Sequence, residues 1–307
     1  MKKLGFLLLV MLAGLPVSGQ QDQTASAPPP AVASLLDLKP DAQGKLSQQQ
    51  MQQLLRVVAD KDLENDKRLR DYTYIEREVE HRLDGKGQVK STEVKTYDVM
   101  EIYGEQVERL TQKDDKPLSE KDAAKEEEKI QKIIDKRKNE SEGDRKKREQ
   151  KAEKDREEGR KFVREVADAY DFTLVGTESL GGREAWVIDG EPRPGFEPRM
   201  KESKFLSKFR GRVWIDKNDL QLARMDVECL DTISWGLFLA RFHKGSRFML
   251  EQTRVNDEVW LPLHVTAKID VRLALLKNFD VDLEQTYRDY KKFRATAKIL
   301  SVGDVKP

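Results

Sequence analysis

The strongest constraint on the fold is a long alternating run near the C-terminal end of the chain. From Val259 to Val271 every second residue is apolar, while the residues between them include Trp260, His264, Lys268 and Asp270. Successive side chains of a β-strand point to opposite faces, so the run predicts a strand with one buried and one solvated face. A chain that contains such a strand needs a sheet whose apolar face is covered.

Further strands are predicted from alternation, apolar content and the turns between them. We expect strands at Tyr72–Leu83, Val89–Tyr103, Gln106–Thr111, Phe172–Val175, Ala185–Ile188, Phe209–Asp216, Leu222–Leu230, Ser246–Val255, Phe279–Lys291 and Phe293–Leu300. Short turns at Asp84–Gly87, Lys217–Asp219 and Asn256–Asp257 favour antiparallel hairpins. The apolar segment Trp235–Phe242 is expected to form a short helix or a loop. Many one-sided antiparallel strands favour a curved sheet around a filler, which is another sheet, a helix or a ligand.

A helix is expected ahead of the first strand. Ser47 is a suitable N-cap, and Met51, Leu54, Leu55 and Val58 follow at helical spacing. The pattern predicts a helix over about Gln48–Arg70.

The middle of the chain is unusually rich in charge. Between Lys113 and Glu165, 36 of 53 residues are charged, 19 of them basic and 17 acidic. Ser119 and Asp122 resemble a capping box, and residues 139–143 interrupt the run. The pattern predicts two long solvated helices, with a partner-binding arm as the functional alternative. Lys146–Arg148 is flanked by acids, which argues against a nucleic-acid surface.

The first residues have the pattern of an export signal. Lys2 and Lys3 precede the apolar run Leu4–Leu15, and the small residues of Val17–Gly19 follow. The run is shorter than the ~20 residues that span a bilayer. The sequence therefore predicts a signal peptide at 1–19 and a periplasmic or secreted protein. Since no cysteine follows the signal closely, no lipid anchor is expected, and the polar, proline-containing residues 20–45 are expected to form a flexible leader.

Neither the composition nor any sequence motif indicates a catalytic, cofactor-binding or metal-binding site. The chain carries a net charge of +1 and a single cysteine, Cys229, which excludes an intramolecular disulfide and is expected to be a small buried hydrophobe. His81, His243 and His264 lie far apart, and no known hydrolase, zinc-protease or phosphate-binding motif is present. We therefore predict no catalytic residue, no cofactor and no metal, and take the acids of the later strands as a solvated sheet face.

Apolar and aromatic residues are the more informative set. A curved sheet lined by them either encloses an acyl chain or is an ordinary close-packed core, and the sequence leaves both open. If a ligand cavity exists, the candidate lining residues are Val213, Ile215, Met225, Val227, Val259, Leu261, Leu263, Val265 and Ile269.

Two segments resemble a known family. Phe209–Asp216 leads through a turn into Leu222–Asp226, which is similar to a G-x-x-W-[IV]-D, turn, x-x-R-[ML] hairpin, and Leu180–Ile188 is similar to a G-x-x-A-[WY] strand entry. Both resemble periplasmic proteins related to the lipoprotein carrier LolA, its partner LolB and the sigma-factor regulator RseB, a family associated with outer-membrane lipoprotein sorting. The resemblance covers Leu46–Thr111 and Phe172–Leu300.

The resemblance implies an α+β fold, in which a curved antiparallel half-barrel is closed by helices and interrupted by a long charged helical hairpin. The half-barrel would comprise residues 46–112 and 171–307, and the charged insertion 113–170. The family's concave face holds acyl chains, which implies a non-enzymatic binder or carrier of a lipid or lipoprotein acyl chain. The alternative is an envelope sensory or interaction module that binds a protein partner through Lys113–Glu165. A hydrolase with an unrecognised site ranks last.

Overall fold

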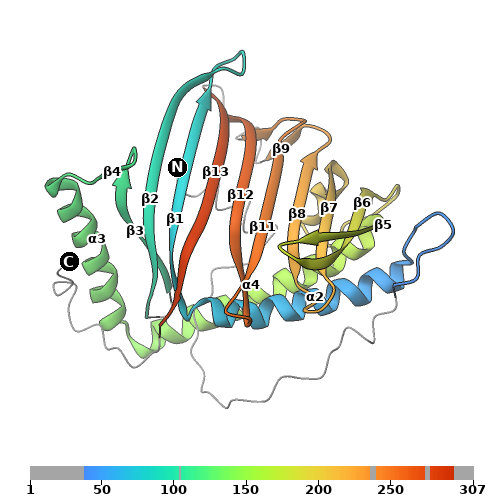
Figure 1. Ribbon diagram of the computed structural model, residues 1–307, viewed down its shortest axis with the longest axis horizontal. Coiled ribbons are helices and arrows are strands. Elements are labelled where there is room, and N and C mark those ends of the chain that lie inside the picture. Colours follow the sequence, from blue (N-terminus) through green and yellow to red (C-terminus); the bar gives the residue numbers. More distant parts are fainter. Residues whose placement is uncertain (1–37, 104, 236–239, 274–276, 294–307) are drawn as a thin grey trace.

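The chain folds into one large sheet with helices along its concave side (Figure 1). The computed structural model describes residues 38–103, 105–235, 240–273 and 277–293. The expected signal peptide, most of the expected leader and the expected last strand beyond Phe293 lie outside these residues. At the end of the expected leader, Lys45 forms a bridge with Thr173.

The sheet is open and antiparallel. Its strands run in the order β4-β3-β2-β1-β13-β12-β11-β8-β7-β6-β5, with β9 and β10 attached beside β12. Their bounds are β1 Tyr72–Leu83, β2 Val89–Ile102, β3 Glu105–Lys113, β4 Lys116–Pro117, β5 Tyr170–Leu180, β6 Arg183–Pro192, β7 Phe209–Asp216, β8 Leu222–Cys229, β9 Ile233–Trp235, β10 Ala240–Phe242, β11 Arg247–Val255, β12 Val259–Leu273 and β13 Lys277–Lys292. The α+β half-barrel class predicted from the sequence is confirmed.

Two local predictions were wrong. The segment Trp235–Phe242 was expected to be a helix or loop, but its ends belong to β9 and β10, which pair with each other while β10 also pairs with β12. Strand β5 is longer than the expected Phe172–Val175 because a register shift between Leu174 and Gly176 breaks the alternation without ending the pairing with β6.

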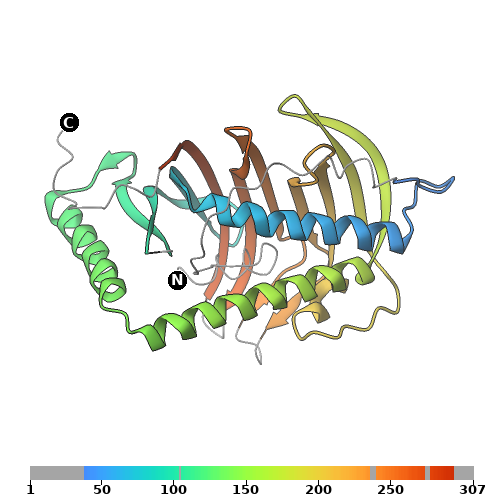
Figure 2. The same cartoon turned by 90° about the horizontal axis from the view of Figure 1, so that it is seen from below.

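Two long helices lie side by side across the opening of the curved sheet (Figure 2). Helix α2 spans Gln48–Leu69, and Ser47 is its N-cap, as expected; the structure adds that Ser47 and Gln50 form a capping box. The Gln50 amide N–H donates to Ser47 Oγ at 3.2 Å, and the Ser47 N–H donates to Gln50 Oε1 at 2.8 Å. Met51 and Leu54, both fully buried, pack into the main core between α2, α4 and strands β5 to β7.

The charged segment forms the two long helices that were expected, α3 at Glu120–Lys138 and α4 at Glu142–Ala169. They do not lie antiparallel as a hairpin: α3 packs beside β3, and α4 runs beside α2 (Figure 2). The segment is attached to the sheet at both ends. Ile130 of α3 is 1% exposed and packs on Ile102 and Val107 of β2 and β3. The last turns of α4 enter the main core through the residues Phe162, Val166 and Ala169. The solvated surface of the two helices is therefore their outer face.

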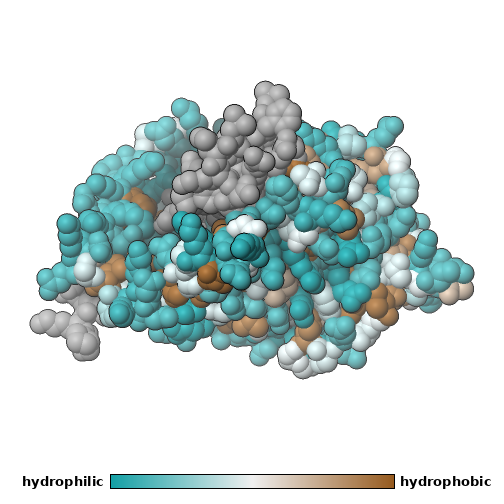
Figure 3. Space-filling view, turned by 90° about the horizontal axis from the view of Figure 1, so that it is seen from above, coloured by the Kyte–Doolittle hydropathy of each residue, from teal (hydrophilic) through white to brown (hydrophobic). Residues whose placement is uncertain are grey.

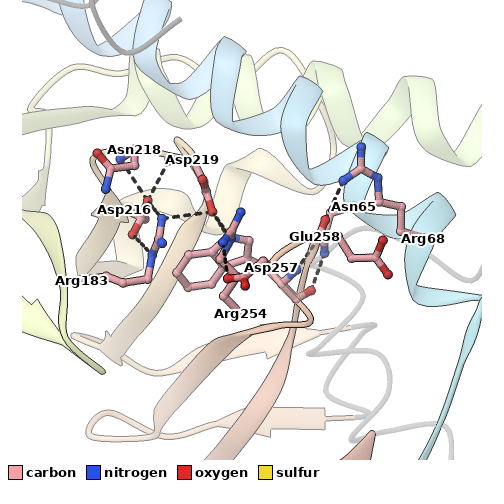
Figure 4. A network of polar contacts seen from close by, with 10 residues as sticks. Asn65, Arg68, Arg183, Asp216, Asn218, Asp219, Arg254, Asp257 and Glu258 are labelled. Carbon is pink, nitrogen blue, oxygen red and sulfur yellow. Dashed lines mark hydrogen bonds and ion pairs between the residues drawn. The ribbon is translucent and has the colours of Figure 1, made fainter. Parts of the chain in front are cut away.

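The C-terminal half of α2 is fastened to the β11–β12 hairpin by side chains that bind its backbone (Figure 4). Asn65 Nδ2 donates to the carbonyl oxygen of Trp260 at 2.5 Å and Asn65 Oδ1 accepts from the Trp260 N–H at 2.6 Å. Arg68 donates to the carbonyl oxygen of Glu258 at 2.6 Å. These bonds fix α2 against one rim of the half-barrel.

A second part of this network joins three hairpins at the same rim (Figure 4). Arg183 makes a bidentate contact with the buried Asp216 at 2.7 and 2.9 Å. The neighbouring Asp219 accepts from Arg183 at 3.1 Å, from Arg254 at 2.8 Å and from the Trp260 indole N–H at 2.9 Å. One carboxylate thus ties the β5–β6, β7–β8 and β11–β12 regions together.

We expect the Arg183→Met variant to lower the free energy of unfolding by about 3 kcal/mol, because it leaves the Asp216 carboxylate buried without its cation. The matched control is Arg210→Met, whose partner Glu228 is 35% exposed in its side chain; it should cost less than about 1 kcal/mol. Urea unfolding of both variants measures the difference. Equal losses would contradict the assigned role of the network.

Candidate functional site

An apolar cavity of about 180 Å³ lies against the concave face of the sheet. Its walls come from α4, from the 3₁₀ helix η2 (Ser203–Lys208) and from strands β5 to β12. Seven aromatic side chains line it: Phe162, Tyr170, Phe172, Phe205, Phe209, Phe242 and Phe248. Aromatic and aliphatic surfaces of this kind bind apolar molecules by removing their surface from water.

The cavity brings together some of the residues expected from the sequence. Four of the nine candidates line it: Val213, Met225, Val227 and Ile269. They come from three strands, β7, β8 and β12. On each strand they belong to the set of alternate residues whose side chains point to the concave face.

The structure places the other five candidates elsewhere. Ile215 and Val265 are in packed core clusters, and Val259 and Leu261 are fully buried in a small cluster with Tyr72. Leu263 is 40% exposed. It lies at a register shift, since Glu251 pairs with His264 and Gln252 with Pro262, so Leu263 has no partner opposite it.

Several lining residues were not expected from the sequence. Phe162 and Val166 lie four residues apart on one face of α4, and Phe205 and Leu206 come from η2. The only sequence signal for the first pair was its helical spacing at the end of a charged segment. Nothing in the sequence around η2 indicates that it covers the sheet.

Two glycines lie on neighbouring strands of the cavity wall. Gly190 of β6 pairs with Gly211 of β7. A Cβ on Gly190 would approach the Phe172 ring at 3.2 Å, whereas a Cβ on Gly211 would lie at an ordinary 3.5 Å from Val227 Cγ2. The Phe172 ring therefore occupies the space beside Gly190, whereas Gly211 leaves room on the concave face for a side chain.

The uncharged polar groups of the cavity wall are already bonded. Tyr170 donates its hydroxyl proton to the carbonyl oxygen of Leu206 at 2.7 Å, and burial raises the pKa of that hydroxyl. Cys229, fully buried as expected, donates to the carbonyl oxygen of Asp231 at 3.0 Å, and burial raises its thiol pKa. Both groups stay neutral, so this part of the wall offers hydrocarbon and satisfied dipoles rather than charge.

Charged side chains border the cavity as well. Arg210 of β7 pairs with Glu228 at 2.8 Å, and Arg247 of β11 pairs with Asp226. Both arginine side chains are at least half exposed, and Lys268 of β12 is exposed too. Since these cations reach water, they lie at the border of the cavity rather than in its dry interior.

A second, open cleft lies between the start of α2, the end of α4 and the β6–β7 connection. It is polar, and its central carboxylate is already engaged. Asp168 accepts from Gln52 at 2.7 Å, from Gln48 at 3.2 Å and from Arg199 at 3.2 Å. We interpret this cleft as the joint between the two helices.

Carboxylates occupy the concave face away from the cavity, on β1. Glu76, 7% exposed, accepts from Gln285 at 2.8 Å, and Glu78 accepts from the same amide group at 3.2 Å. Desolvation raises the pKa of Glu78. The inner face of the half-barrel is therefore mainly apolar over β6 to β12, while over β1, β2 and β13 these carboxylates lie among the buried residues Tyr74, Tyr97, Val99 and Tyr287.

Within the described ranges, no group of three or more histidine, cysteine, aspartate or glutamate side chains is arranged to hold a metal ion. The three histidines have separate partners: His81 contacts Thr92, His264 contacts Glu284, and His243 lies 3.9 Å from Asp270.

Among the residues that the structure describes, no helix combines the length and apolarity needed to cross a membrane. Seen from above, the described surface is mostly hydrophilic (Figure 3).

No protein-family model and no curated protein matches this chain. Solved structures similar to it include members of the family that its hairpin resembles. One is a putative outer membrane lipoprotein-sorting protein domain from Vibrio parahaemolyticus, 11% identical, with a TM-score of 0.32, covering 80% of this chain and 95% of that one. Another is a LolA superfamily protein from Nitrosomonas europaea, 8% identical, with a TM-score of 0.29, covering 82% and 97%.

A third is a DUF1329 family protein from Desulfovibrio piger, 10% identical, with a TM-score of 0.26, covering 80% of this chain and 95% of that one. Similarity at this level does not assign a function, so the interpretation of the cavity depends on the residues that line it.

Asp62 provides a test of how dry the space beneath α2 is. It follows Leu55 and Val58 on the inner side of α2, and burial raises its pKa to about 6. Because the folded protein favours the protonated Asp62 carboxyl, ionisation of this group does not reduce the free energy of unfolding below about pH 4. It lowers the free energy of unfolding as the pH rises through about 6.

We expect the Asp62→Asn variant to raise the free energy of unfolding at pH 8 by about 1–3 kcal/mol, since each pH unit of pKa shift corresponds to about 1.4 kcal/mol. The gain should disappear below about pH 4. Asp60→Asn, an exposed position on the same helix, is the control. A gain independent of pH would show that burial of the Asp62 carboxylate is not the cause. Chemical unfolding across this pH range measures it.

Proposed function

We propose that this protein binds the hydrocarbon tail of a lipid or of a lipid-modified protein in the cavity under its curved sheet. The observation that carries the proposal is an aromatic- and aliphatic-lined cavity on the concave face, with its uncharged polar groups already bonded. A tail that enters gains by leaving water, without any covalent chemistry. Binding of this kind is reversible, which suits a carrier.

The signal-like residues 1–19 support an activity in the periplasm or outside the cell, after their removal. Residues 46–112 and 171–307 would form the binding domain. The charged segment of residues 113–170 then supplies one wall of the cavity through the end of α4. No catalytic step is part of the proposal.

We expect the Val227→Trp variant to lower the affinity for a fluorescent fatty acid about tenfold or more, because the indole fills space that the tail would occupy. Met249→Trp is the matched control, since Met249 lies between Phe248 and Leu250 and therefore points to the opposite face of the sheet. Titration of wild type and both variants, with native mass spectrometry of the purified protein, provides the measurement. Equal affinity in all three would refute binding at this cavity.

A second candidate function is contact with a protein partner through the outer faces of α3 and α4. Lys132, Lys147 and Lys154 are 73%, 81% and 73% exposed in their side chains. In the contacts described, each pairs with a carboxylate three or four residues away on its own helix. Such surface pairs contribute little to stability, so these charges are not needed for the fold.

Reversing these three lysines to glutamate should leave the unfolding free energy and fatty-acid affinity within about 0.5 kcal/mol of wild type, as is usual for exposed sites. If the helices bind a partner, in-cell crosslinking from this face should be lost in the variant. Unchanged crosslinking would argue against the second function without affecting the first.

A further inference from the structure

We infer that the cavity takes one hydrocarbon chain at a time, and that Gly211 is the residue that determines how much of that chain it accepts. This inference rests on the proposed function and adds to it a ligand class and a specificity-determining position. Three features of the protein support it: the size of the cavity, the chemistry of its wall, and the place of Gly211 in β7.

The cavity is small. Its volume of about 180 Å³ lies below the roughly 300 Å³ at which pockets for drug-sized ligands begin. We therefore expect the space to take part of one narrow chain rather than two or three chains side by side.

The wall selects for hydrocarbon. Among the described residues that line the cavity, none has a buried side-chain nitrogen or oxygen without a hydrogen-bond partner. Ser246 donates its hydroxyl to the carbonyl oxygen of His243 at 2.9 Å, and Tyr170 donates to Leu206. A polar head group that entered the interior beyond the bordering cations Arg210, Arg247 and Lys268 would lose its water without gaining a partner, which costs free energy. The head group of the ligand therefore stays at the border or outside.

Gly211 has no structural reason to be glycine in its own strand. It lies within β7 and its φ is not in the left-handed region. The register of β7 with β8 runs through it without a shift, while the pairing of β7 with β6 ends at Gly211, opposite Gly190. Glycine inside a regular strand weakens that strand and often marks a place where a ligand or another backbone approaches. An added Cβ would lie in ordinary contact beside Val227, in the cavity wall.

Gly190, opposite Gly211, differs in this respect. The packing requires glycine at position 190, because an added Cβ would lie only 3.2 Å from the Phe172 ring. An added Cβ at Gly211 would lie 3.5 Å from both the Asp226 carbonyl oxygen and Val227 Cγ2, which are ordinary contact distances, so alanine fits there. A larger side chain at position 211 would extend into the cavity and shorten or narrow the space for the chain.

The test is a titration of straight-chain fatty acids from six to eighteen carbons against wild type, Gly211→Ala and Gly211→Leu. In wild type, affinity should rise about fourfold for each added methylene until the enclosed space is filled and then level off. In Gly211→Ala and more strongly in Gly211→Leu, the levelling should occur at shorter chains. Gly85→Leu is the control, since a Cβ at Gly85 meets nothing within 4 Å.

Native mass spectrometry on the same samples should show one chain per protein. Two chains bound per wild-type protein, or a levelling point unchanged in both Gly211 variants, would overturn the inference and leave the proposed function standing. Absence of any binding to wild type would overturn the proposed function and this inference with it. Gly211→Ala keeps the test valid should the leucine variant fold poorly.

Discussion

The curvature of a single antiparallel sheet is the constraint on which the rest of this structure depends. A sheet that curves without closing has an inner face that no second sheet covers, and that face must be shielded from water by something else. Here α2 and the end of α4 do so, and their main contribution is burial, through Met51 and Leu54 on one helix and Phe162 and Val166 on the other. The cavity is the part of the inner face that these helices do not fill.

The polar network at one rim follows from the same constraint. Helix α2 can shield the sheet only if its position is fixed, and hydrophobic contact alone is not directional. Asn65 supplies direction by pairing with both the N–H and the carbonyl oxygen of Trp260. Asp216 and Asp219 in turn hold together the hairpins on which that anchor depends. The buried carboxylate of Asp216 therefore has a structural role, which is to hold these hairpins in position.

Much of this fold was predictable from local patterns, whereas the site was predictable only in part. Alternation located β12, β7 and β8, and the Ser47 N-cap with the helical spacing after it located α2 to within a residue, because these signals depend on neighbours in the sequence. The cavity depends on residues distant in sequence. The sequence pattern does not distinguish Val213 from Val259, because both lie in alternating runs. In the structure Val213 lines the cavity, whereas Val259 packs in a core cluster.

The distribution of charge over the inner face limits what the proposed binding could distinguish. The carboxylates Glu76 and Glu78 lie on β1, away from the cavity over β6 to β12, whereas Arg210, Arg247 and Lys268 stand at the border of the cavity. If a tail binds there as proposed, the free energy of binding comes from buried apolar area, which distinguishes ligands by length and width but not by head group. Selectivity among lipids with the same tail would then arise from contacts at the border of the cavity or outside it. On this proposal the cavity provides affinity, and the charged surfaces around it provide any choice of partner.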